Sequence, residues 1–256
     1  MKRQKKFALV LSLLLVFALI APAAAAKDSD SAIKNVIFMI GDGMGENHLL
    51  LAKEQGYDLF MDRSPDLRGQ SMTRSFSDEV TDSAAGATAL SCGVRNINRG
   101  LCTYWFDPVG LFVQPRIITE EAIAHGMKTG IVTTDKTSGA TPAGYSSHCV
   151  DRSFAKQISF EQMRSGIDLI WGANEDEATE KDALRNGWQY ITTKEEMDAL
   201  TPGTRSFGQF SGNTWWESVP KDDPSPTLQQ MGEKAIALLN ADNENGEYTL
   251  TGIAPL

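Results

Sequence analysis

The apolar and polar positions of this chain alternate between patterns typical of buried strands and patterns typical of helices. Residues 35–40 form a largely apolar, β-rich run that ends in Gly41-Asp42-Gly43. A run that is apolar on both faces predicts a central strand of a parallel sheet. Open α/β sheets bind their ligands at the carboxyl ends of such strands, so we expect Asp42 at a ligand-binding edge.

The same alternation continues through the rest of the chain. The further predicted elements are strands at 128–134, 167–171, 188–191 and 204–210, and helices at 118–124, 159–164, 194–200 and 225–240. The last helix has the clearest signals, because Ser225 is a suitable N-cap and Pro226 suits the first helical position. Alternating β and α units predict a three-layer α/β/α sandwich.

The amino-terminal segment has the pattern of an export signal. Four basic residues precede an apolar run over 7–21, and Ala24-Ala25-Ala26 offers a cleavage site. The run is shorter than the ~20 residues that span a bilayer, although a retained membrane anchor is the alternative. We expect residues 1–26 to be a cleaved signal peptide, the protein to be secreted or periplasmic without a stable membrane anchor, and 27–256 to form the folded part.

The most informative segment is 80–90, VTDSAAGATAL. Asp82 or Ser83 makes a suitable helix start, and the small residues that follow allow close packing. A serine at a helix N-terminus lies beside unpaired backbone N–H groups and the positive end of the helix dipole, which together favour a bound phosphate. The alternative is that Ser83 serves only as an N-cap.

A Ser83 nucleophile would need activation by a base or a metal. The nucleophile-elbow pattern of Ser-His-Asp hydrolases requires glycine two residues before and two after the serine, and these positions are Thr81 and Ala85. Metal coordination is therefore the better candidate, with Asp42 as a hard oxygen ligand.

Charge narrows the classes of partner. The formal net charge is −9, and removal of residues 1–26 takes away four basic residues and no acidic ones, giving −13. Such a chain is a poor candidate for nucleic-acid binding, which needs basic residues to neutralise phosphates. A phosphate site on it must gather positive charge locally, from a metal ion or an arginine.

Three segments resemble motifs of the alkaline phosphatase family, in the order and at the spacing of that family: 36–45 (VIFMIGDGMG), 80–94 (VTDSAAGATALSCGV) and 140–152 (ATPAGYSSHCVDR). The segments 165–173 and 225–239 resemble the same family. The resemblance implies an alkaline phosphatase-like sandwich, hydrolysis of phosphate monoesters through a phosphoserine, Zn²⁺ and Mg²⁺ as cofactors, and an assembly compatible with a homodimer.

The resemblance also implies roles for individual residues. Asp42 matches a carboxylate that bridges a zinc and the magnesium, Ser83 matches the nucleophile beside that zinc, and Thr141 matches a magnesium ligand. Arg152 matches the guanidinium that grips two phosphate oxygens, and Asp82 would orient it. Taken singly, Asp42 could be a strand-end cap, Thr141 a turn residue and Arg152 a surface charge; their joint occurrence favours the functional interpretation.

Two departures from the family pattern stand out. Gly139 occupies the position two before Thr141, where many members carry a carboxylate or an imidazole near the magnesium. After residue 240 the later Glu, Asp and His ligands of the family are absent, and His48, His125 and His148 match none of them. Zinc sites normally need three or four N, S or O ligands.

We therefore expect 27–256 to be the N-terminal part of an alkaline phosphatase-like domain, incomplete at its C-terminus and inactive or impaired by itself. The alternative is a non-catalytic remnant or a weak phosphate-binding fragment. A sulfatase or a phosphopentomutase of the same superfamily is a weaker alternative. A sulfatase is disfavoured because Ser83 is followed by Ala-Ala-Gly and not by the pattern that sulfatases need.

The cysteines leave two arrangements open. Cys92, Cys102 and Cys149 are an odd number for an exported protein. One bridge between the nearest pair, Cys92 and Cys102, would leave one free thiol, and three free thiols is the alternative. Spacing alone does not fix the connectivity.

Overall fold

The structure is a computed structural model of the 256-residue chain. It describes residues 34–63, 69–106, 110–174, 179–211, 223–241 and 248–255, all within the compact unit Lys34–Leu256. The predicted signal peptide, 1–26, lies outside the described residues. None of the described helices has the length and apolar character needed to cross a membrane.

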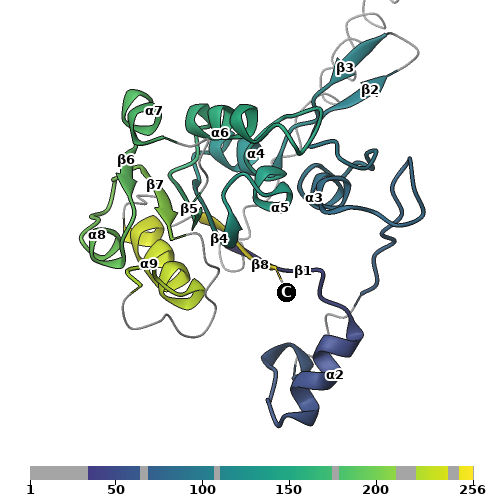
Figure 1. The fold of residues 1–256 in the computed structure, drawn as a ribbon, viewed down its shortest axis with the longest axis horizontal. Helices are drawn as coiled ribbons and strands as arrows, with labels where there is room; N and C mark the ends of the chain where they lie inside the picture. Colours follow the sequence, from purple (N-terminus) through teal and green to yellow (C-terminus); the bar gives the residue numbers. More distant parts are fainter. Residues whose placement is uncertain are drawn as a thin grey trace, which may run out of the picture. The chain divides into compact units, whose positions relative to one another are not determined.

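A six-stranded parallel sheet organises this unit, with strand order β1-β8-β4-β5-β7-β6 (Figure 1). The strands are β1 (Asn35–Asp42), β4 (Lys128–Lys136), β5 (Leu169–Ala173), β6 (Gln189–Ile191), β7 (Ser206–Phe210) and β8 (Tyr248–Pro255). A separate antiparallel pair consists of β2 (Tyr104–Phe106) and β3 (Leu111–Val113). The predicted parallel α/β architecture is confirmed. The buried, central position predicted for 35–40 is wrong: β1 is an edge strand of the described sheet and pairs only with β8, so Met39 is 85% exposed.

Helices pack on the sheet in two separate cores. The helical elements are α2 (Glu46–Glu54), the short 3₁₀ helix η1 (Phe60–Asp62), α3 (Ser83–Cys92), α4 (Ile118–Ala124), α5 (Ala140–Ala143), α6 (Ala155–Arg164), α7 (Glu180–Arg185), α8 (Lys194–Asp198) and α9 (Leu228–Ala241). Along β5, Ile170 packs in a core with Met163 of α6, whereas Trp171 packs in a core with Met231 of α9. Because neighbouring strand residues face opposite sides of a sheet, these two cores are the two interfaces of a three-layer α/β/α sandwich.

The last helix begins later than its sequence signals predict. Helix α9 starts at Leu228 because Thr227 and Gln230 form its cap: the Thr227 Oγ1 accepts from the Gln230 N–H at 3.2 Å, and the Thr227 N–H donates to Gln230 Oε1 at 2.9 Å. The hydroxyl of Ser225, the expected N-cap, instead donates to the Ser211 hydroxyl at 2.7 Å.

The second turn of α3 closely approaches the end of α5 at Gly144. A Cβ on Gly144 would lie 2.5 Å from the Ala87 Cβ of α3, well inside the distance that real Cβ atoms show. Gly232 of α9, by contrast, has no atom within 4 Å of its Cβ position.

These two glycines give a matched prediction. Gly144→Ala should lower the free energy of unfolding by about 1–3 kcal/mol, because a methyl group is forced into a filled space. Gly232→Ala should raise it by about 0.5–1 kcal/mol, because alanine is the better residue in a helix interior. Urea unfolding of both variants checks the pair, and a Gly144→Ala chain as stable as the unchanged chain would contradict the packing of α3 on α5.

Candidate active site

Three of the predicted site residues meet at the carboxyl end of β1. Asp42 is the last residue of that strand, and each of its carboxylate oxygens accepts one hydroxyl. Ser83 Oγ donates to Asp42 Oδ1 at 3.2 Å, and Thr141 Oγ1 donates to Asp42 Oδ2 in a short hydrogen bond. The two hydroxyls come from the first turns of α3 and α5, so Asp42 links two helix N-termini to one strand end.

Asp82 caps α3 and joins it to the predicted phosphate-binding arginine. Its Oδ1 accepts from the Ala85 N–H at 3.0 Å, which satisfies one of the unpaired donors at the start of the helix. Its Oδ2 accepts from Arg152 Nη1 at 3.2 Å. The guanidinium of Arg152 is therefore tethered to the residue next to Ser83, and part of its side chain is exposed to solvent.

A loop that the sequence interpretation missed holds this arginine. Arg99 adopts a left-handed backbone with φ of 76°, its N–H donates to Asp82 Oδ2 at 3.0 Å, and its carbonyl accepts from the Arg152 N–H at 2.8 Å. Its side chain makes two 2.8 Å hydrogen bonds with Asp151, and these keep the pKa of that carboxyl below its usual range. A positive φ on a residue with a Cβ is typical of functional turns, and the neighbouring Asn98 and Gly100 are the sequence signal for one.

Gly139 is explained by a second residue that was missed, Asp135. A Cβ at Gly139 would lie 2.0 Å from Asp135 Oδ2, so the Asp135 carboxylate fills the space where a side chain at 139 would begin. Burial raises the pKa of Asp135, and the charge of Asp42 adds to that rise. Asp135 therefore supplies a carboxylate near Asp42. It lies four residues before position 139, where many members of the family carry a carboxylate or an imidazole.

The oxygen atoms gathered at this site suit Mg²⁺ better than Zn²⁺. Asp42, Thr141 and Asp135 present carboxylate and hydroxyl oxygens, the donors that Mg²⁺ prefers. Zinc sites draw on imidazole, thiolate and carboxylate ligands. Within the described ranges, no group of three or more His, Cys, Asp or Glu side chains lies together so that it could hold a metal ion.

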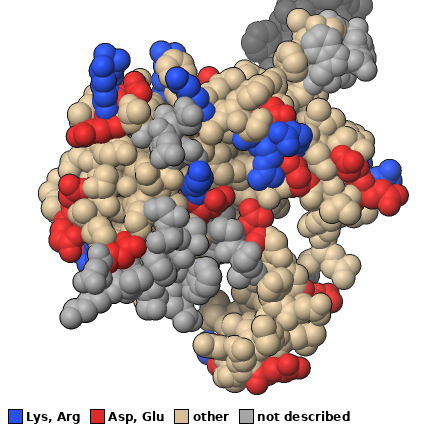
Figure 2. Space-filling model, viewed as in Figure 1, with Lys and Arg blue, Asp and Glu red and all other residues tan. Residues whose placement is uncertain are grey.

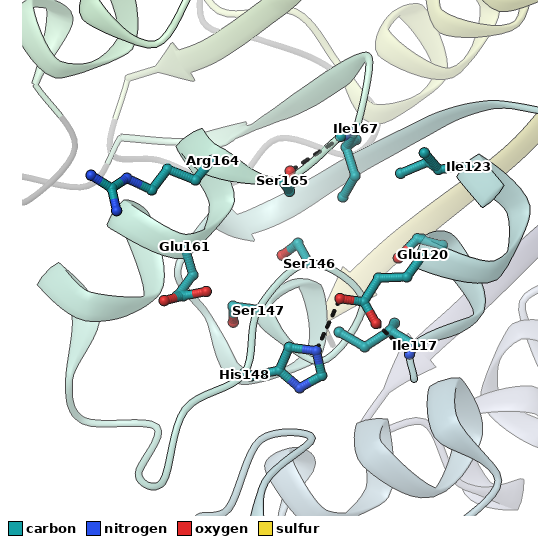
Figure 3. A pocket seen from close by; sticks show the side chains of 12 residues that line it. Ile117, Glu120, Ile123, Ser146, Ser147, His148, Glu161, Arg164, Ser165 and Ile167 are labelled. Carbon is teal, nitrogen blue, oxygen red and sulfur yellow. Dashed lines mark hydrogen bonds and ion pairs between the residues drawn. The ribbon is translucent and has the colours of Figure 1, made fainter. Parts of the chain in front are cut away.

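The pocket near α6 does not coincide with this site. Figure 2 shows acidic and basic side chains interspersed on the face in view. A pocket between α4 and α6, lined by residues such as Glu120, His148 and Arg164, includes none of the predicted site residues (Figure 3). The positive charge of the site comes from Arg152 and from the N-terminus of α3.

Comparisons with known proteins identify the family of this chain. The family model described as alkaline phosphatase matches residues 33–170, which is more than half of the chain. The chain belongs to the alkaline phosphatase family. Two curated relatives are alkaline phosphatase 4 of Bacillus subtilis (strain 168), 29% identical over 89% of this chain and 52% of its own length, and alkaline phosphatase H of Pseudomonas aeruginosa (strain UCBPP-PA14), 37% identical over 86% of this chain and 59% of its own.

Solved structures of alkaline phosphatases share the fold. The cold-active alkaline phosphatase of a Shewanella species superposes with a TM-score of 0.69 at 26% identity, covering 87% of this chain and 56% of that protein. The chain thus spans about half the length of the alkaline phosphatases that it matches.

Proposed function

We propose that this chain carries the nucleophile and the phosphate-holding arginine of an alkaline phosphatase that hydrolyses phosphate monoesters. One observation supports the proposal most: Ser83, at the N-terminus of α3, shares the Asp42 carboxylate with Thr141, while the preceding residue, Asp82, holds Arg152. A hydroxyl, a helix N-terminus and a guanidinium therefore converge where a phosphate would sit.

The proposed reaction has two displacements at phosphorus. In the first, Ser83 Oγ forms a bond to phosphorus, the ester P–O bond breaks, and the alcohol leaves with a proton. In the second, water adds to the phosphoserine, releasing inorganic phosphate and restoring the Ser83 hydroxyl. Arg152 holds two of the non-bridging oxygens, and the first N–H groups of α3 stabilise the charge that develops on them.

Asp42, Thr141 and Asp135 would hold Mg²⁺ through their oxygens, with Asp135 in place of a side chain at 139. A bound divalent cation supplies charge neutralisation and a lowered pKa for a nearby hydroxyl. Asp42 keeps the Ser83 hydroxyl oriented toward the phosphate, since the two form a 3.2 Å hydrogen bond. The zinc-binding set expected from the family is not assembled within the described residues.

Hydrolysis by this chain alone should be weak. Binding of phosphate needs only Arg152 and the α3 N-terminus, whereas activation of Ser83 needs a firmly held metal ion, for which the described site residues offer two carboxylates, Asp42 and Asp135, and two hydroxyls. This difference favours a second candidate function, weak phosphate binding without turnover.

We further propose that residues 1–26 direct export and that the mature chain works in the periplasm or outside the cell.

A fusion of residues 27–255 to the remaining half of Pseudomonas aeruginosa alkaline phosphatase H tests the proposal. We expect the fusion to hydrolyse 4-nitrophenyl phosphate at alkaline pH in a chelator-sensitive manner, and the 256-residue chain to show little activity. A folded fusion without activity would contradict the proposed hydrolase. Robust hydrolysis by the purified chain, free of host phosphatase, would contradict the expected weakness.

A further inference from the structure

Cys92 and Cys102 lie together at the end of α3 opposite to Ser83. Cys92 is the last residue of the helix and is partly exposed, whereas Cys102 is fully buried. The Ser91 hydroxyl contacts both sulfurs, at 3.5 Å from Cys92 Sγ and 3.6 Å from Cys102 Sγ. The Cys92 thiol donates to the Pro115 carbonyl at 3.8 Å, and the Cys102 thiol donates to the Gly144 carbonyl at 3.1 Å. All three cysteines carry free thiols in the structure.

The two thiols are suited to different steps of one reaction. The neighbouring Cys102 lowers the pKa of Cys92, and Cys92 together with burial raises the pKa of Cys102. His148 is held by the Cys102 carbonyl at 2.7 Å and by Glu120 at 3.0 Å; Figure 3 shows its contact with Glu120. His148 lowers the pKa of Cys92 further, whereas the charge of Glu120 raises it. Cys92 is thus the more acidic and the more accessible thiol, and thiolate is the form that attacks disulfides.

Cys149 is directed elsewhere. An antiparallel β-bridge between Leu101 and Cys149 brings the Cys149 backbone near Cys102. The Cys149 sulfur is nevertheless buried and donates to the Asp151 carbonyl at 3.2 Å. Burial also raises the pKa of this thiol. Cys149 therefore serves as an internal reference for reactivity.

We propose that Cys92 and Cys102 are a disulfide-forming pair, a site of oxidative modification by small disulfides such as oxidised glutathione. The Cys92 thiolate attacks one sulfur of the oxidant, forming a mixed disulfide and releasing one glutathione thiolate. Cys102 then attacks Cys92 Sγ, forming the intramolecular bond and releasing the second glutathione. Two protein thiols lose two electrons and two protons, and the oxidant is reduced to two thiols.

The bridge would close a loop that supports the phosphate site. Between the two cysteines lie Asn98, whose side chain accepts from the Asp82 N–H at 3.1 Å, and Arg99, which binds both Asp82 and Arg152 through its backbone. Oxidation therefore tethers the ends of the loop that holds the arginine. This consequence rests on the proposed function, whereas formation of the bridge does not.

Treatment of the native, reduced 256-residue chain with oxidised glutathione, followed by alkylation and mass spectrometry, tests the pair. We expect the unchanged chain and Cys149→Ser to lose two alkylatable thiols and to link the tryptic peptides 75–95 and 100–116, which are separable because Arg95 and Arg99 lie between the cysteines. Cys102→Ser should stop at a glutathione adduct on Cys92. Cys92→Ser should keep both remaining thiols free.

Three free thiols in the treated native chain, or a bridge that includes Cys149, would overturn the proposal. A melting temperature measured on the oxidised and reduced forms gives a second readout, expected to be on the order of 5 °C higher for the oxidised form because the bridge restricts the unfolded chain. An unchanged or lower melting temperature would contradict the inferred tethering of the loop. Neither readout depends on phosphatase activity, so failure here leaves the proposed hydrolase untouched.

Discussion

Replacement of Ser83 by alanine in the fusion enzyme is expected to reduce hydrolysis of 4-nitrophenyl phosphate by about a thousandfold or more. The substitution removes the oxygen that would form the bond to phosphorus, while the α3 N-terminus and Arg152 stay in place. Binding of inorganic phosphate should therefore survive far better than turnover. The kcat of the variant and its inhibition constant for phosphate, measured together, separate the two effects.

Ser91→Ala is the matched control for this prediction. Ser91 lies in the same helix, at the opposite end, and its hydroxyl contacts only the sulfurs of Cys92 and Cys102 among the hydrogen bonds of the described structure. We expect this variant to retain nearly full activity. If both serine variants lost activity equally, damage to α3 would be the explanation, and Ser83 would lose its assignment as nucleophile.

The second large effect concerns Arg152. Changing Arg152 to lysine in the fusion should raise the inhibition constant for inorganic phosphate about tenfold or more, because an ammonium group cannot make the planar, two-pronged contact of a guanidinium. A lost hydrogen bond to a charged group is worth about 1.5–3 kcal/mol, which corresponds to this range. The tether to Asp82 should weaken as well.

Arg164→Lys controls for a general effect of losing a guanidinium. Arg164 is the last residue of α6, where its guanidinium stacks on Phe160 at 3.8 Å from the ring centroid. In the described part of the chain it forms no hydrogen bond or ion pair with a predicted site residue. The inhibition constant of the Arg164→Lys variant for inorganic phosphate should stay unchanged. A variant at Arg152 that bound phosphate as tightly as the Arg164 variant would remove Arg152 from the site.

Local patterns in the sequence predict most of the sheet and the residues that depend on it. The apolar run of β1 predicts a strand that ends at Asp42, and the small residues after Ser83 predict a helix that packs closely. The same run wrongly predicts burial, because β1 lies at the edge of the described sheet. Strand β8 was not predicted, although it pairs with both β1 and β4. The reason is that its place in the sheet is set by partners more than a hundred residues earlier, and not by its own pattern.

The contacts around Arg152 were only partly predictable for a similar reason. The motif containing Arg152 gives the residue, but the Arg99 carbonyl that holds its backbone comes from a turn with an unusual φ, for which a single sequence gives only the weak signal of Asn98 and Gly100. Asp135 escaped notice because only the folded chain brings its carboxylate into the space left by Gly139.

The central claim, that Ser83 receives the phosphoryl group, is tested most directly by locating the phosphate on the protein. The fusion enzyme is incubated with radiolabelled inorganic phosphate at acid pH, where a phosphoserine is trapped, and is then digested with trypsin. Peptide 75–95 contains four serines, Ser75, Ser77, Ser83 and Ser91, and fragmentation in the mass spectrometer distinguishes them. We predict one phosphate on Ser83; label on another residue, or an equally labelled Ser83→Ala variant, would contradict the account.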